Sequence, residues 1–187
     1  MEKSITYFEK PGKENTEELI SLVKDRLKDS DIKYVAIASA SGESALKLAE
    51  NIENITIINV THHAGFHEPN ELDITKEMRE KLEEKGVVTF VGSHALSGVG
   101  KGIAKQLGGL NPVEIMAQTY RTFSQGIKVC AEISIMLADA GLVPVDEEII
   151  SIGGTGHGVD TAVVITPANM TKVFDINIHE IIAMPRN

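Results

Sequence analysis

The feature that most constrains this sequence is the alternation of short apolar segments with longer amphipathic ones. The short segments have the length and composition of strands and lie near residues 34–38, 55–60 and 87–91. The longer segments repeat their apolar residues at helical spacing and lie at residues 15–28, 41–52 and 75–86. Strands that alternate with helices are joined by right-handed crossovers, which make neighbouring strands parallel. We therefore expect the α/β fold class, as a three-layer sandwich with a mainly parallel sheet.

A second helical region is expected in the middle of the sequence. Residues 99–109 have the pattern of a short helix, and residues 111–141 have that of a long helical region with a break near Gly126. Residues 127–140 are apolar on most sides, so they should be buried in the core or in a subunit interface. Cys130 lies among these apolar positions and is expected to be an inert core residue.

Three further strands are expected toward the C-terminus, near residues 148–152, 160–165 and 178–185. Only six residues, from Gly153 to Gly158, separate the first two of these strands. Because six residues are too few for a helical crossover, the strand that starts near Val159 is expected to run antiparallel to its neighbour.

Composition narrows the function classes. Of 187 residues 42% are apolar, so we expect a single domain over residues 1–187 with a sizeable core. The formal net charge of −9, without any basic block, argues against nucleic acid as a partner. No apolar run approaches the length of a membrane span, so no membrane association is expected. A single cysteine and the lack of a signal-peptide pattern favour the cytoplasm.

The first candidate binding motif lies where an expected strand passes into a helix, and it comprises Ser39, Ser41, Gly42, Glu43 and Ser44. The first amides of a helix have no partner within the helix, so an anion can bind there, and the serine hydroxyls would add donors. The alternative is that Ser41 only caps the helix, as serines commonly do. The sequence does not decide between these interpretations.

The second candidate motif, Gly92, Ser93 and His94, lies at the end of another expected strand. It narrowly misses the P-loop pattern G-x-x-x-x-G-K-[ST], because Ala95 and Gly102 occupy two of the required positions. We therefore exclude a nucleotide triphosphatase. Ligands of open α/β sheets bind at the carboxyl ends of the strands, so His94 and the nearby Lys101 are candidates for ligand contact.

The third candidate motif is the segment SIGGTGHGVDTAVVI, residues 151–165, in which glycines surround one histidine. It is not a dinucleotide fingerprint, because the third glycine is missing and a strand-like segment follows. A tight turn needs only one or two glycines, so the excess favours close approach of a ligand to the backbone. The candidate residues are Gly153, Gly154, Thr155, Gly156, His157 and Gly158.

A fourth segment, THHAGFHEP, contains possible metal ligands in His62, His63, His67 and Glu68. Its spacing is weaker evidence than it looks, because histidines four residues apart share a face only on a helix. Gly65 and Pro69 make this segment a loop. We therefore favour the interpretation that this segment is a mobile loop that covers a pocket, and metal binding stays the alternative.

The segments SASGESALKLA and GGTGHGVDTAVVI resemble parts of the C-terminal α/β domain of pyruvate kinase. In that family a T-x-S-G-x-[ST]-A loop and a later glycine-rich loop hold the phosphates of a sugar bisphosphate effector. The resemblance implies that the first and third motifs bind phosphate here. The whole chain also resembles a small family of stand-alone proteins that carry only this domain.

This sequence departs from pyruvate kinase in ways that change the expected ligand. No segment corresponds to the barrel domain, so we expect no kinase activity. Both loops lack the basic residues that help to hold a bisphosphate, since Glu43 stands in the first and His157 in the second. We therefore expect a monophosphate. The resemblance to the stand-alone proteins implies flavin mononucleotide (FMN), with its phosphate on residues 41–44, its ring along residues 153–158 and His94 at the ring's edge.

Two other functions stay open. The histidine loop would suit a metal-dependent hydrolase that uses His62, His63 and His67. The apolar helix would suit a non-catalytic scaffold subunit of an oligomer, and a homo-oligomer is expected in either case. Whether the protein is an enzyme is left open.

Overall fold

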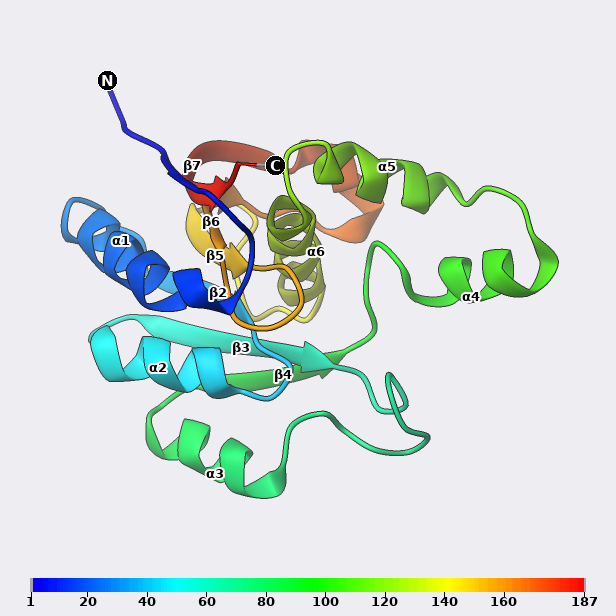
Figure 1. Cartoon of the computed structure of the whole chain (residues 1–187), viewed down its shortest axis with the longest axis horizontal. Helices are drawn as coiled ribbons and strands as arrows, with labels where there is room; N and C mark the ends of the chain where they lie inside the picture. Colours follow the sequence, from blue (N-terminus) through cyan, green and yellow to red (C-terminus); the bar gives the residue numbers. More distant parts are fainter. Residues whose placement is uncertain (1, 187) are drawn as a thin grey trace.

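The computed structural model describes residues 2–186, in which the strands form one seven-stranded sheet (Figure 1). The strands are β1 (Thr6–Phe8), β2 (Tyr34–Ala38), β3 (Thr56–His62), β4 (Val88–Gly92), β5 (Ile149–Gly153), β6 (Thr161–Thr166) and β7 (Asn177–Pro185). Their order across the sheet is β1-β7-β6-β5-β2-β3-β4. Within this sheet β6 runs antiparallel to both of its neighbours, and the other pairs are parallel.

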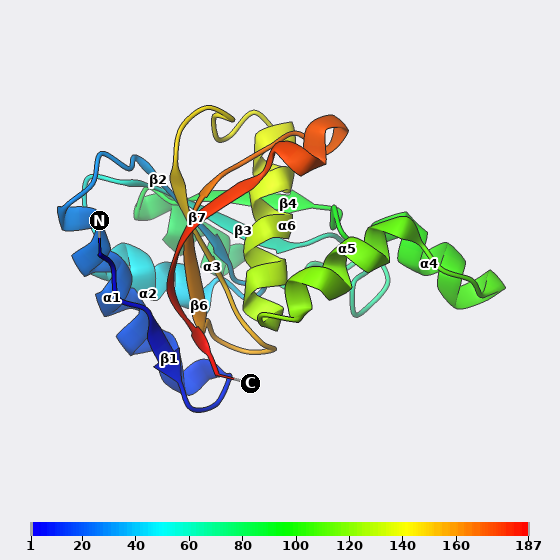
Figure 2. The same ribbon diagram turned by 90° about the horizontal axis from the view of Figure 1, so that it is seen from above.

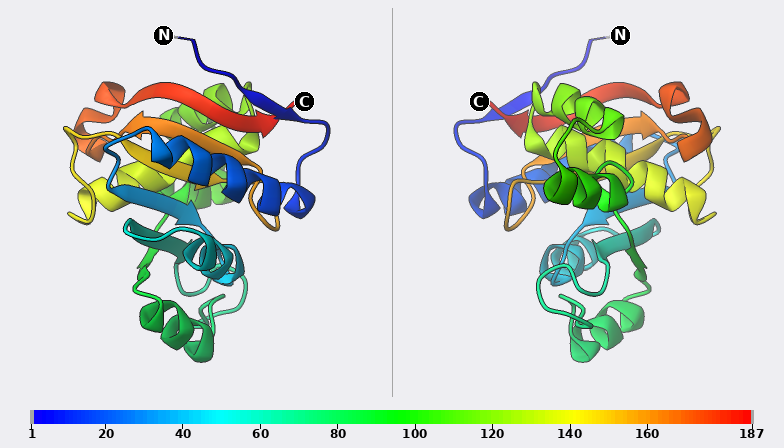
Figure 3. Two further views of the ribbon diagram at one scale, coloured as in Figure 1. Left: turned by 90° about the vertical axis from the view of Figure 1, so that its left-hand side faces the viewer. Right: turned by 90° about the vertical axis from the view of Figure 1, so that its right-hand side faces the viewer.

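Helices cover both faces of this sheet. They are α1 (Thr16–Lys28), α2 (Glu43–Asn51), α3 (Lys76–Glu84), α4 (Gly98–Leu107), α5 (Pro112–Arg121) and α6 (Gln125–Asp139), with short 3-10 helices η1 (Lys13–Asn15) and η2 (Met170–Asp175). The two views of Figure 3 show α1 in front of the sheet from one side and α5 and α6 in front of it from the other. No helix among residues 2–186 combines the length and apolarity that a membrane crossing requires.

The two largest of three apolar clusters lie on opposite faces of the sheet, and the small third one is formed by Leu96, Ala117 and Ile135. Leu19 of α1, Leu48 of α2 and Leu82 of α3 pack against one face. On the opposite face, α6 packs through Ile133 and Leu137 against β2, β3, β5 and β6. Alternate residues of each strand enter opposite clusters, as a sheet covered on both faces requires. The expected three-layer α/β sandwich is therefore confirmed.

The predicted strands are present and pair as expected. Val35 of β2 lies directly opposite Ile57 of β3 in a parallel ladder. The antiparallel direction of β6 is also confirmed. The short edge strand β1 and the helix η2 were not predicted, because three residues and one distorted turn carry too little periodic signal.

The long helical region is interrupted at residues 122–124 rather than at Gly126. Ser124 caps α6, since its hydroxyl accepts from the Ile127 amide at 3.1 Å. Gly126 lies within the first turn of α6, where an added Cβ would stand 2.0 Å from Oγ1 of Thr161. This glycine therefore allows α6 to approach β6 closely and does not break the helix.

The expected burial of α6 is confirmed, and it is burial within the core of this chain. Cys130 is fully buried, and its thiol donates to the Ser151 carbonyl at 3.2 Å. Burial raises the pKa of this thiol, which fits the expected inert core role.

Replacement of Gly126 by alanine should lower the free energy of unfolding by about 1–3 kcal/mol, because the added methyl group overpacks the contact with Thr161. Gly102→Ala is the matched control, since a Cβ on this helical glycine of α4 would meet no atom within 4 Å. The control should be as stable as the wild type or slightly more stable, because alanine favours helix. Urea unfolding measures both variants, and equal stability would contradict the close contact.

Candidate functional site

A cavity of about 640 Å³ opens at the carboxyl ends of β2 and β3. Its walls come from the loop after β5, from α4 and from the face of α6 that lies beside the sheet. From β2 the chain crosses to β3 and then to β4 on one side of β2, whereas β5 pairs with β2 on its other side. The strand order therefore reverses at β2. Open α/β sheets bind ligands at such a reversal. The fold therefore places a ligand-sized cavity where the sequence analysis expected one.

The cavity wall is basic although the chain carries a formal net charge of −9. Lys101 and Lys105 of α4, Arg121 at the end of α5 and Lys128 of α6 line it. Glu132 is the one carboxylate among the described lining residues. Apart from Glu132, the acidic residues of the described chain lie outside the lining, so the cavity wall is locally positive and attracts anions.

Lys128 and Glu132 form a buried ion pair one turn apart on α6. A second oxygen of Glu132 accepts from the Leu96 amide at 2.8 Å, so the carboxylate also holds the loop before α4. Burial lowers the pKa of Lys128, and the adjacent Glu132 carboxylate opposes this effect. This pair was not predicted, because residues 127–140 are apolar on most sides, although a lysine and a glutamate four residues apart are visible in the sequence.

The other cations differ in their partners. Arg121 donates to Gln125 Oε1 at 2.7 Å and to Glu114 Oε1 at 3.1 Å. Lys101 and Lys105 are exposed on α4, and neither makes an ion pair with another residue in the range 2–186. These two ammonium groups can therefore turn toward a bound anion without breaking an existing ion pair.

Of the first predicted motif, Ser39 lines the cavity, whereas Ser41, Gly42, Glu43 and Ser44 are not among the lining residues. The Ser39 hydroxyl accepts from the Ser44 amide at 3.2 Å, and the Ser41 hydroxyl accepts from the Glu43 amide at 3.4 Å. These two amides at the start of α2 are thus already bonded within the chain. The geometry supports the capping interpretation of this motif.

Gly42 has a structural reason to be glycine. Its φ is +87°, which favours glycine, and an added Cβ would lie 2.7 Å from Cγ of Met78. The expected FMN position, with the phosphate on residues 41–44 and the ring along residues 153–158, requires Gly42 and Gly156 to share one pocket. They do not, because Gly42 packs against α3 while Gly156 lines the cavity.

The third motif divides in the same way, with Gly154, Gly156, His157 and Gly158 in the cavity wall and Gly153 and Thr155 outside it. An added Cβ would lie 2.7 Å from the Gly126 carbonyl at Gly153, 2.6 Å from the Gly158 carbonyl at Gly154 and 2.4 Å from Cα of Lys13 at Gly158. Tight packing thus explains these three glycines. Gly156 has φ +76°, which itself favours glycine, but a Cβ there would meet no atom within 4 Å, so among these four glycines only this position leaves room for a ligand to approach the backbone.

Asp160 fixes the glycine loop. This carboxylate is fully buried and accepts from the amides of Gly12 at 3.0 Å and Thr155 at 3.2 Å. The hydroxyl of Thr161 donates to its other oxygen at 2.8 Å. Buried charged groups are stable when they are fully hydrogen-bonded, so Asp160 ties the loop both to the N-terminal segment and to β6.

Of the second motif, His94 lines the cavity, whereas Gly92 and Ser93 are not among the lining residues. A Cβ at Gly92 would lie 2.4 Å from the ring of Phe90, which gives this glycine a packing reason. The His94 ring meets His62 edge-on with centroids 5.2 Å apart. Burial lowers the pKa of His94, and although Glu132 opposes this, His62 and Lys128 lower it further.

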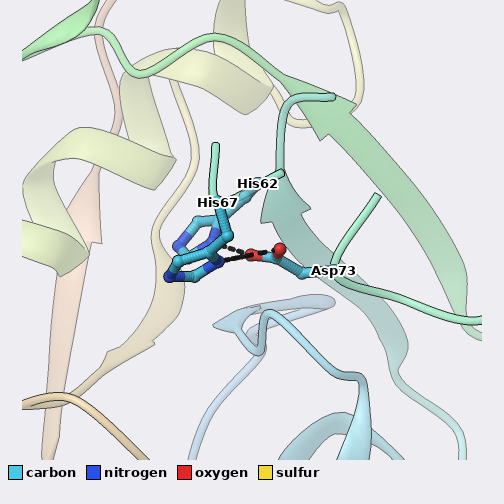
Figure 4. A group of neighbouring side chains, drawn as sticks. All are labelled: His62, His67 and Asp73. Atoms are coloured by element: carbon cyan, nitrogen blue, oxygen red, sulfur yellow. Dashed lines mark hydrogen bonds and ion pairs between the residues drawn. The ribbon is translucent and has the colours of Figure 1, made fainter. Parts of the chain in front are cut away.

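The histidine loop brings together a different set from the predicted one. His62 and His67 both direct Nδ1 at the carboxylate of Asp73, as Figure 4 shows. His63 instead bonds to the Ala64 carbonyl at 2.9 Å, and Glu68 is not in the group. Burial alone would raise the pKa of Asp73, but hydrogen bonds from His67 and His62 outweigh it, so the pKa is lowered.

A comparison with protein-family models is consistent with this architecture. The model described as "Pyruvate kinase, alpha/beta domain" matches residues 17–165. The match extends from the first residues of α1 into β6 and includes every element that lines the cavity.

The buried pair on α6 predicts a specific stability defect. Glu132→Gln keeps an oxygen that can accept from the Leu96 amide but leaves the Lys128 ammonium without a counter-charge. Breaking a buried pair in this way costs about 3–5 kcal/mol. The double variant Lys128→Met/Glu132→Gln removes both charges and should recover most of the loss. Urea unfolding measures both, and equal free energies of unfolding for the single and double variants would contradict the coupling.

Proposed function

Because this chain belongs to the family of pyruvate kinase α/β domains, we propose that it binds a phosphorylated small molecule in the cavity described above, with FMN as the specific ligand. One observation carries the proposal: four cationic side chains and a single carboxylate line a cavity in a chain whose formal net charge is −9. Two of these cations, Lys101 and Lys105, make no ion pair among residues 2–186, so they give the carboxyl end of the sheet the electrostatics of an anion-binding site. The proposal is of binding, and it assigns no reaction to the cavity.

The phosphate is proposed to bind at the basic wall formed by Lys101 and Lys105. Charge-assisted hydrogen bonds from lysine to phosphate are roughly twice as strong as neutral ones. The amides of Glu43 and Ser44 are less suited to this role, because serine hydroxyls already accept from them. Because α4 supplies the cations, the two predicted loops need not contain basic residues. Their lack of basic residues therefore no longer favours a monophosphate ligand over a bisphosphate.

The other walls of the cavity suit a flat ring. A volume of about 640 Å³ lies in the range of about 300–1,000 Å³ that small-molecule sites occupy. At Gly156 the wall is open backbone, and Phe66 and His94 supply aromatic surface nearby. These features favour FMN over a compact sugar phosphate, which has no flat face to pack.

A homo-oligomer stays a prediction, but α4 now supports it better than α6. The sheet and α5 cover α6 within one chain, so α6 is not a free apolar face. In contrast, α4 projects from the body of the molecule (Figure 2) and has no buried residue among its ten. Val99, Ile103 and Leu107 are all more than half exposed on it, and we propose that a second copy of this chain covers them.

FMN should bind ligand-free protein at least about tenfold more tightly than riboflavin, because one charge-assisted hydrogen bond contributes roughly 1.5–3 kcal/mol. The double variant Lys101→Ala/Lys105→Ala should shrink this ratio. Isothermal titration calorimetry with both flavins measures it, in buffer that contains a chelator and no phosphate.

The matched control for this test is Lys76→Ala/Lys81→Ala on α3, which removes the same charge far from the lining residues and should leave the ratio unchanged. The variant Ser41→Ala/Ser44→Ala tests the alternative position at the start of α2. If this variant alone shrinks the ratio, the phosphate binds there. Absence of binding of either flavin at about tens of micromolar would rule out FMN.

Gly156→Asn should weaken FMN binding about tenfold, or by about 1.4 kcal/mol, with little change in stability. Gly156 has φ +76°, which asparagine tolerates, and its added side chain would enter the open cavity. Gly141→Asn is the control, because Gly141 has φ +68°, equally open surroundings and no place in the cavity wall. Calorimetry and urea unfolding measure the two effects, and unchanged affinity in folded Gly156→Asn protein would reject the ring position.

A further inference from the structure

We propose that His62, His67 and Asp73 form a binding site for a divalent transition-metal ion of the zinc class. Their three ligand atoms lie within 4.8 Å of one another. Figure 4 shows both imidazoles facing the same carboxylate from one side. This proposal is independent of the phosphorylated ligand, because none of the three residues belongs to the basic wall.

The spacing of the ligand atoms is that of a metal shell. Nδ1 of His67 lies 2.9 Å from each oxygen of Asp73, and Nδ1 of His62 contacts one of the same oxygens. Zinc binds imidazole nitrogen and carboxylate oxygen at about 2.0–2.2 Å, which places neighbouring ligand atoms about 3 Å apart. A small ion therefore needs only minor side-chain rotation to contact all three residues.

The backbone around the group holds the ligands in place. His62 is the last residue of β3, and Asp73 lies just before Thr75, which caps α3. Between them the chain forms a closed loop, since the Gly65 amide donates to the Glu71 carbonyl at 2.9 Å. Phe66, the residue before His67, stacks on His62 with ring centroids 3.8 Å apart. One ligand thus comes from a strand, and the other two come from the loop between β3 and α3.

The donor set selects the class of ion. Two imidazoles and one carboxylate suit zinc and its neighbours in the first transition row, whereas calcium and magnesium prefer oxygen ligands. Three protein ligands leave at least one coordination position open. His62 and His67 both line the cavity, so the proposed metal site borders it.

The same geometry has a second explanation, in which each imidazole donates an N–H to Asp73 and no ion is involved. The two accounts differ in what they expect of added metal. A pair of N–H donors gives no saturable site, because the nitrogens that face the carboxylate carry protons. A metal site gives one bound ion per chain that depends on all three residues.

The experiment is a zinc titration of the full chain by isothermal titration calorimetry, in chelator-free buffer without any phosphorylated compound. We expect one zinc ion per chain. His67→Ala and Asp73→Asn should each weaken this binding at least about tenfold, which is a modest loss for removal of a direct ligand. The His67 side chain is 66% exposed, so its truncation should leave the fold intact, which circular dichroism checks.

His63→Ala is the matched control, because His63 belongs to the same loop but points its ring at the Ala64 carbonyl. Its zinc affinity should stay within about twofold of the wild type. Absence of zinc binding at about 100 µM would overturn the proposal. So would equal losses in His63→Ala and His67→Ala, which would indicate scattered surface histidines. Because the flavin titration contains a chelator, either proposal can fail while the other stands.

Discussion

The structure depends on the close packing of α6 against β5 and β6. Two glycines allow this contact: a Cβ on Gly126 of α6 would lie 2.0 Å from Oγ1 of Thr161 in β6, and a Cβ on Gly153 of β5 would lie 2.7 Å from the Gly126 carbonyl. Because the helix lies so near the sheet, its apolar side fills the core while its next face stands at the carboxyl ends of the strands. Lys128 and Glu132 occupy that face, so the packing of one helix contributes to both the core and the wall of the cavity.

The cavity shows how a chain with net negative charge can present a local site of the opposite sign. The basic residues that line it come from α4, α5 and α6, three elements that follow one another along the chain. The same cavity is also lined by His62, His63, His67 and His94. Its wall thus combines cations from the helices with imidazoles, three of which come from the end of β3 and the loop after it.

The sequence predicts the scaffold of this protein better than its site. The alternation of patterns predicts the parallel strands, and the six-residue gap before Val159 predicts the reversal of β6, because both are local signals. The sequence identifies Lys101 as a candidate for ligand contact, but the basic wall as a whole could not be recognised in this way, since Lys101 and Lys128 line one cavity only after three helices have folded. The same holds for Asp73, which lies outside the histidine segment and reaches it through the closure of a loop.

The glycine-rich segment shows why motif counting alone misled. At Gly153 and Gly158 a Cβ would meet residues that are distant in the sequence, and at Gly154 it would meet the backbone of the loop itself. Of these four glycines, only at Gly156 would a Cβ meet no atom within 4 Å. A glycine needed for packing and one needed for a ligand look identical in a sequence. The resemblance to the pyruvate kinase domain pointed to the edge of the sheet at which the cavity opens, while the contacts within that edge came from three-dimensional packing.

The central claim is that a phosphorylated ligand binds in this cavity, and a crystal structure of the protein grown with FMN tests it most directly. The account predicts electron density for the phosphate beside Lys101 and Lys105, with the ring against the backbone at Gly156. Density for the phosphate at the amides of Glu43 and Ser44 would contradict the role assigned to the basic wall. A well-ordered structure with an empty cavity at saturating FMN would contradict the proposed ligand.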